Sequence, residues 1–372
     1  MSITWYQLDG HLKRLAIAKR VPIVGQFELT ARCNLRCKMC YVVRAKDDKD
    51  AMARERTAEE WIRLAEEARD AGMLYLLLTG GEVFLRQDFA KIYEAVARMG
   101  FSTTIYTNAT LITPAIARWL GGIPPSRIEV TLYGASPETY AKVCGDAEGF
   151  RRAVHGLDLL LAEGIGVSLR TTIIDSNVDD FDELARLAQK RGITLQVVNY
   201  VSPRREGCGT GPQTERLSPQ ELARFEMHIR KMGEKKEKKA TADNRPLDDC
   251  AFEEDRADKI IGDMLSRPVE DAFNCLAGKC AFWMTWDGRM TPCALMNQPE
   301  TLLFDRAFTE AWKELQTMCA AIPACSACMR CSLKKDCMVC PARLYNETGF
   351  YDQPAAYLRE LAKERGVIMN NE

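Results

Sequence analysis

Apolar stretches typical of β-strands alternate with amphipathic stretches typical of helices from residue 23 to residue 199. The clearest helix begins with the capping box Thr57-Ala58-Glu59-Glu60 and ends before Gly72. The next strand, at residues 73–78, is continuously apolar, as expected of a strand buried on both faces. Strands that alternate with helices pair in parallel, because each helix returns the chain to the same end of the sheet. The sequence therefore predicts an α/β fold.

Six strands are predicted in this region. They cover residues 26–30, 73–78, 103–106, 128–132, 167–174 and 195–199. Periodicity does not distinguish an open parallel sheet from one that curls into a barrel. In either architecture the carboxyl ends of the strands are where ligands bind.

Cys33, Cys37 and Cys40 follow the first predicted strand at C-x3-C-x2-C spacing. Structural zinc sites and ordinary iron–sulfur cubes use four protein ligands, whereas this group supplies three. Three thiolates this close together can hold a 4Fe–4S cluster and leave one iron open to another ligand. The alternative is a zinc knuckle whose fourth ligand lies elsewhere in the chain.

This triplet at the end of a first strand resembles the signature of the radical S-adenosylmethionine (SAM) enzymes. The resemblance implies a partial (β/α)6 barrel and a 4Fe–4S cluster whose open iron binds SAM. It also implies an enzyme that cleaves SAM to a 5′-deoxyadenosyl radical, which removes a hydrogen atom from the substrate. The electron would come from a reductant such as flavodoxin or ferredoxin.

Several residues match positions that hold SAM in this family. Gly80, Gly81 and Glu82 follow the second strand, and the resemblance implies that they bind the SAM amino group. Glycines allow close approach of the backbone to a ligand because they carry no Cβ. The other implied contacts are Asn108 at the ribose, Met39 near the adenine, and Ser168 and Arg170 at the ribose or carboxylate. For Arg170, a structural ion pair is an equally good interpretation.

The chain has fifteen cysteines, and those after residue 274 resemble the SPASM extension of radical SAM enzymes. The resemblance rests on Cys275 with Gly288-x4-Cys293, and on Cys328-x2-Cys331-x5-Cys337. Two features depart from the family pattern. Cys337 and Cys340 are spaced C-x2-C rather than C-x3-C, and no cysteine follows Cys340.

By this resemblance we expect two auxiliary 4Fe–4S clusters. The first would use Cys275, Cys280, Cys293 and Cys340. The second would use Cys328, Cys331 and Cys337, with a fourth ligand from Cys325 or Cys319. One or two structural zinc sites are the alternative, because C-x2-C pairs also bind zinc.

Cys208 lies in a glycine-rich segment just after the sixth strand, near the expected barrel mouth. A thiol there could return a hydrogen atom to a substrate radical, which we state as a hypothesis. The alternative is an ordinary loop cysteine, since a free cysteine often behaves as a small hydrophobe. Cys144 and Cys250 fit neither cluster group.

Composition limits the remaining possibilities. The net charge is −1, so no bulk attraction to nucleic acid or to a membrane surface is expected. We find no signal peptide and no apolar stretch of bilayer-spanning length, and the many thiols favour a reducing cytoplasm. Three separated histidines disfavour a histidine-built metal site or a serine hydrolase.

Four segments are expected: an N-terminal arm (1–22), the radical SAM core (23–202), a charged bridge (203–274) and a SPASM-type domain (275–372).

Relatives of this type mostly modify ribosomally synthesised peptides, by thioether or carbon–carbon links or by epimerisation, so a peptide substrate is expected. Only 32 residues precede Cys33, so leader recognition would need a separate protein or a different surface. The alternatives are a sulfatase-maturase-like enzyme, a small-molecule dehydrogenase or cofactor-biosynthesis enzyme, and a non-enzymatic iron–sulfur electron carrier or zinc scaffold.

Overall fold

The computed structural model describes all residues except 1–3, 43, 202–214, 243–271, 305 and 371–372. Among the described residues, nine strands form one sheet in the order β11-β10-β9-β1-β4-β5-β6-β7-β8. The six from β1 to β8 are mutually parallel. They are β1 (Val24–Glu28), β4 (Tyr75–Thr79), β5 (Ser102–Thr107), β6 (Arg127–Thr131), β7 (Val167–Thr172) and β8 (Leu195–Val198). All six predicted strands are confirmed.

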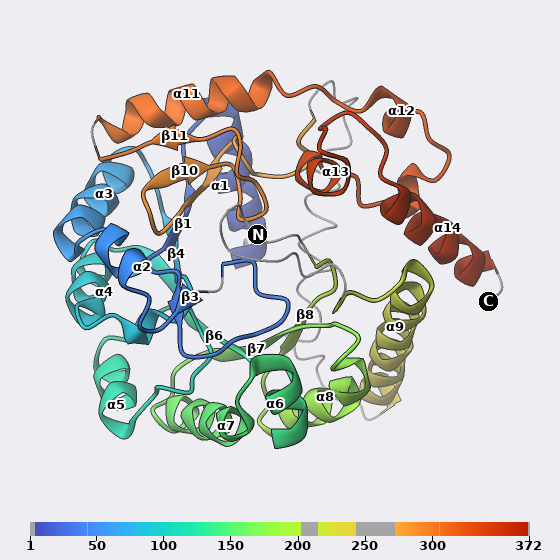
Figure 1. Cartoon of the computed structure of the whole chain (residues 1–372), viewed down its shortest axis with the longest axis horizontal. Coiled ribbons are helices and arrows are strands. Elements are labelled where there is room, and N and C mark those ends of the chain that lie inside the picture. The colour runs from blue at the N-terminus through green and yellow to red at the C-terminus, as the bar shows by residue number, and fades with distance from the viewer. Residues whose placement is uncertain (1–3, 43, 202–214, 243–271, 305, 371–372) are drawn as a thin grey trace.

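Helices cover the outer side of this sheet, and the strands curve inside them (Figure 1). The covering helices are α3 (Ala58–Asp70), α4 (Phe89–Arg98), α5 (Pro114–Gly122), α6 (Pro137–Cys144), α7 (Ala147–Ala162) and α8 (Phe181–Lys190). Among the residues that the structure describes, β8 and β11 each pair on one side only, so the sheet formed by these residues does not close. The core is therefore a partial barrel, as expected.

Helix α3 shows why these elements form where the sequence places them. The Thr57 hydroxyl accepts a hydrogen bond from the Glu60 backbone N–H at 3.2 Å, and the Glu60 carboxylate accepts from the Thr57 N–H at 2.7 Å. This capping box satisfies two of the unpaired donors at the helix start. Trp61 and Leu64 lie on the buried face. At the other end the chain turns through Gly72, whose φ is +103°.

The C-terminal part of the chain extends the same sheet. Strands β9 (Ala281–Met284) and β10 (Arg289–Thr291) form an antiparallel hairpin, and β11 (Thr301–Leu302) pairs with β10. Strand β9 lies parallel to β1, with Trp283 opposite Gln26. The Trp283 indole N–H donates to the buried carboxylate of Glu28 at 3.0 Å. The sheet thus continues across residue 275, where we expected a domain boundary.

Several elements lie outside this sheet. Helix α1 occupies the segment expected to be an N-terminal arm, and α9 lies in the segment expected to be a charged bridge. Helix α9 packs against α14. These outer helices are α1 (Trp5–Lys19), α2 (Lys49–Arg54), α9 (Pro219–Ala242), α11 (Phe308–Ala320), α12 (Ser326–Met329), α13 (Pro341–Thr348) and α14 (Ala356–Asn370). In the described part of the chain, no helix is both long enough and apolar enough to cross a bilayer.

Candidate active site

Cys33, Cys37 and Cys40 lie on the loop that follows β1, where the parallel strands have their carboxyl ends. The short strands β2 (Arg32–Cys33) and β3 (Arg44–Ala45) pair and close this loop at its base. Cys33 and Cys37 are buried and Cys40 is half-buried. Burial is the main cause that raises the pKa of the Cys33 thiol. A cationic partner such as iron would favour the ionised form of this buried thiol.

Asn108, at the end of β5, contacts the first of these cysteines. Its side-chain amide N–H lies 3.6 Å from Cys33 Sγ and 3.0 Å from the Asn34 side-chain oxygen, donating to both. The Leu35 backbone N–H also donates to Cys33 Sγ at 3.4 Å. Donors of this kind stabilise a thiolate ligand and tune an iron–sulfur cluster. This environment fits the cluster that the sequence predicts.

Glu82 is a buried carboxyl group beside Asn108. It accepts hydrogen bonds from the Thr107 hydroxyl at 2.8 Å, the Asn108 backbone N–H at 2.8 Å and the Phe84 N–H at 3.2 Å. Burial raises its pKa to about 7, although these hydrogen bonds act in the opposite direction. An ionised carboxylate offers about four acceptor sites, so one remains for a ligand such as an ammonium group.

Gly80 and Gly81 bring the end of β4 against the segment that precedes Cys33. A Cβ atom on Gly80 would lie 2.3 Å from the Thr30 carbonyl oxygen, and one on Gly81 would lie 2.3 Å from that of Arg32. The Gly81 N–H donates to the Thr30 carbonyl at 2.7 Å. In this structure the close approach that the glycines allow is to the protein's own backbone.

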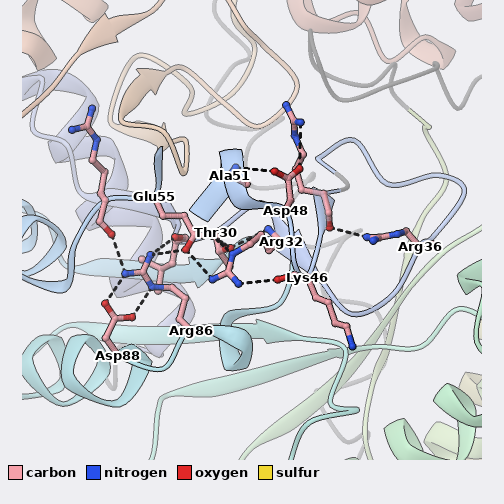
Figure 2. A network of polar contacts seen from close by, with 12 residues as sticks. Thr30, Arg32, Arg36, Lys46, Asp48, Ala51, Glu55, Arg86 and Asp88 are labelled. Atoms are coloured by element: carbon pink, nitrogen blue, oxygen red, sulfur yellow. Dashed lines mark hydrogen bonds and ion pairs between the residues drawn. The ribbon is translucent and has the colours of Figure 1, made fainter. Parts of the chain in front are cut away.

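A buried polar network also holds the segment that precedes Cys33 (Figure 2). The Arg32 guanidinium donates to both carboxylate oxygens of Glu55, at 2.8 and 3.0 Å, and Thr30 donates to the same carboxylate. Arg86 lies 3.7 Å from Glu55 and donates to the Leu29 carbonyl at 2.8 Å. The sequence analysis missed this network, because nothing in the spacing of these residues links them.

Ser168 and Arg170 both lie on β7. The Ser168 hydroxyl is buried and has no hydrogen-bond partner within the described residues, which fits a contact to an absent ligand. Arg170 donates to the Glu129 carboxylate at 3.0 Å, so the ion-pair alternative is observed. The same guanidinium also reaches the Tyr106 hydroxyl and Gln196.

Of two further predicted residues, Met39 and Cys208, the structure describes only Met39. Met39 is buried in the same apolar cluster as Cys33 and Cys37. Cys208, the hypothetical hydrogen donor, lies outside the described residues, as does Cys250.

Cys144, at the end of α6, is a neighbour of the cysteine loop that spacing did not reveal. Its carbonyl accepts from the Arg36 N–H at 2.9 Å, and the Val143 carbonyl accepts from the Lys38 N–H at 3.0 Å. A hydrogen bond to the Cys144 thiol is the main cause that raises the pKa of Cys37. The residues are more than a hundred positions apart, so only the fold brings them together.

The cysteines after residue 274 lie in more than one neighbourhood. Cys328, Cys331 and Cys337 line one cavity of about 320 Å³. Elsewhere, Cys275, Cys293 and Cys340 pack against the main core, whereas Cys280 is buried in a separate apolar cluster beside α1. Within the described residues, no three His, Cys, Asp or Glu side chains are placed to hold a single metal ion.

Three thiols, a buried carboxyl group and an amide side chain thus meet at the carboxyl ends of neighbouring parallel strands. This arrangement defines a cofactor-dependent enzyme built on a partial α/β barrel. Residues 27–188 match the radical SAM superfamily. These residues form a radical SAM domain, which implies a 4Fe–4S cluster and SAM as cofactors.

Three relatives illustrate the similarity. An AdoMet-dependent heme synthase of Methanosarcina barkeri is 25% identical over 341 residues, 90% of this chain and 96% of that protein. A PqqA peptide cyclase of Ruegeria pomeroyi is 32% identical over 171 residues, which is 46% of this chain and 45% of the cyclase. The solved structure of Streptococcus suis SuiB bound to the precursor peptide SuiA shares the fold, with a TM-score of 0.68 and 18% identity. That match covers 93% of this chain and 78% of SuiB.

Proposed function

We propose that this chain is a SPASM-type radical SAM enzyme that modifies a ribosomally synthesised peptide. The observation that carries the proposal is the 32% identity of its core to a PqqA peptide cyclase. The fold similarity to SuiB in its peptide complex supports it and extends through the C-terminal region. The modification would be a thioether link, a carbon–carbon crosslink or an epimerisation.

The residues of the chain would divide the work as follows. Cys33, Cys37 and Cys40 would hold the cluster, and the Glu82 carboxylate would accept a hydrogen bond from the SAM ammonium group. When bound, the cluster and SAM supply the 5′-deoxyadenosyl radical that removes a hydrogen atom from the peptide. The Ser168 hydroxyl, which has no partner within the described residues, would donate to SAM.

Two partners belong to the same proposal. Flavodoxin or ferredoxin would supply the electron. A separate protein, or another surface of this chain, would bind the peptide leader. Both suggestions rest on the resemblance to the family alone.

A second candidate function is the modification of an iron porphyrin. The observation in its favour is coverage: the heme synthase aligns with 90% of this chain, whereas the peptide cyclase aligns with less than half. This candidate corresponds to the cofactor-biosynthesis alternative raised from the sequence.

One experiment separates the two candidates. Anaerobically reconstituted protein is incubated with SAM and dithionite, together with either a precursor peptide encoded beside the gene or an iron-porphyrin precursor of heme. We expect 5′-deoxyadenosine and a modified peptide, detected as the loss of two hydrogen atoms or, for epimerisation, as deuterium uptake from solvent. Conversion of the porphyrin with an unchanged peptide would overturn the proposal and favour the second candidate. A Cys33→Ala/Cys37→Ala/Cys40→Ala variant is the control for chemistry outside the site.

A further inference from the structure

The second cysteine neighbourhood has three thiols in place and lacks a defined fourth. Cys328, Cys331 and Cys337 line its cavity, and Leu344 and Leu358 form part of the apolar wall. The sequence offers Cys325 or Cys319 as the missing ligand. Both are buried to the same extent, at 4% exposure, so burial does not choose between them. Their positions do.

Cys325 lies at the start of the helical turn that carries Cys328. It is the residue before α12, and its carbonyl accepts a hydrogen bond from the Met329 backbone N–H at 3.0 Å. Residues three apart on such a turn lie on the same face. Cys325 is also buried in the apolar cluster against which Cys328 and Cys337 pack.

Cys319 contacts a different segment of the chain. It lies in the last turn of α11 and is buried in the main core. Its Sγ packs directly on Gly278, because a Cβ atom at that glycine would lie only 2.5 Å from it. Gly278 stands between Cys275 and Cys280 in the chain. Cys319 therefore lies beside the segment that carries two of the ligands expected for the first auxiliary cluster.

We propose that Cys325 is the fourth ligand of the second auxiliary cluster and replaces the terminal cysteine that this chain lacks. All four ligands, Cys325, Cys328, Cys331 and Cys337, then come from one segment of thirteen residues. Helix α14 supplies apolar wall through Leu358 and Ala362, and its Arg359 also lines the cavity. A cluster with four thiolates has no open iron, so this one carries electrons or stabilises the fold and binds no substrate. The inference is independent of which substrate the enzyme uses.

Iron content tests this assignment without any measurement of activity. In a background that carries Cys33→Ala, Cys37→Ala and Cys40→Ala, the reconstituted protein should hold about eight irons. Adding Cys325→Ala should lower this to about four, as should Cys331→Ala, and the two changes together should also leave about four, because both act on one cluster. Retention of about eight irons by Cys325→Ala would overturn the proposal. Loss of nearly all iron in the double variant would do the same, because Cys325 would then serve the other cluster.

Cys319 provides the matched control, since it is equally buried. When Cys319→Ala is combined with Cys331→Ala, the pair should not show the non-additive loss of iron that is expected for Cys325→Ala with Cys331→Ala. If Cys325→Ala is not recovered in a folded form, Cys325→Ser replaces it. A serine oxygen ligand would change the low-temperature EPR spectrum of the reduced second cluster, whereas Cys319→Ser would leave that spectrum unchanged. An unaltered spectrum for Cys325→Ser would contradict the assignment.

Discussion

Glu82 gives the fold a pH dependence at the scale of a single residue. Burial raises its pKa from the ordinary 4.5 to about 7, so the folded chain holds this proton more tightly than the unfolded chain. The stability that this bound proton contributes is fully present below pH 4.5 and is lost as the pH rises through about 7. A shift of this size corresponds to about 3 kcal/mol.

Glu82→Gln should remove this dependence, because glutamine keeps the acceptor oxygen and has no titrating proton. We expect the thermal midpoint of the wild type to fall relative to that of the variant between about pH 5 and pH 8. The two proteins should be compared at equal iron content. A constant difference in midpoint across this range would show that Glu82 does not titrate as described.

Gly81 tests the close backbone approach beside Cys33. Gly81→Ala would place Cβ 2.3 Å from the Arg32 carbonyl oxygen, and backbone on both sides leaves little room to shift. We expect a loss of about 1–3 kcal/mol in the free energy of unfolding and reduced iron at the cysteine loop. Gly122→Ala is the control, because nothing lies within 4 Å of its added Cβ. Equal effects of the two changes would argue against steric control at Gly81.

At the scale of elements, Glu55 links three segments around the site. It follows α2, pairs with Arg32 just before Cys33, and lies 3.7 Å from Arg86, which follows the 3-10 turn η1 (Val83–Leu85). Breaking a buried pair leaves an uncompensated charge, so Glu55→Gln should lower stability by about 3–5 kcal/mol. Denaturant unfolding measures this loss, and iron binding by the cysteine loop should weaken with it.

The control for Glu55 is Glu59→Gln, which removes an exposed pair with Lys91. Exposed pairs contribute little, so this change should leave the free energy of unfolding nearly unchanged. If Glu55→Gln behaved like Glu59→Gln, the network would not anchor the loop.

The elements also show what the sequence could predict. The strands and the α3 capping box follow from local periodicity and capping chemistry, so they were found. The meeting of Cys33, Glu82 and Asn108 followed from parallel topology, because the carboxyl ends of neighbouring strands share one edge. The contact of Cys144 with Cys37 could not be predicted, because it joins elements far apart in sequence. The pairing of β9 with β1 was missed for the same reason.

At the scale of the whole molecule, the shared sheet predicts that the core and the C-terminal strands unfold together. Phe282 of β9 is fully buried and packs against Phe27 of β1 and against Phe308 and Trp312 of α11. Phe282→Ala should lower stability by about 3–5 kcal/mol and shift a single calorimetric transition. Phe350→Ala, at an exposed position, should leave that transition in place. Two calorimetric transitions, one for the part of the chain before residue 275 and one for the part after it, would contradict the shared core.

The most direct test of the account is SAM cleavage by the site at the end of β1. Anaerobically reconstituted wild type and the Cys33→Ala/Cys37→Ala/Cys40→Ala variant are reduced with dithionite in the presence of SAM, and 5′-deoxyadenosine is measured. We predict that the wild type forms 5′-deoxyadenosine and that the variant forms none, although the variant retains iron at its C-terminal cysteines. Cleavage by the variant at the wild-type rate, or no cleavage by an iron-loaded wild type, would contradict the central claim.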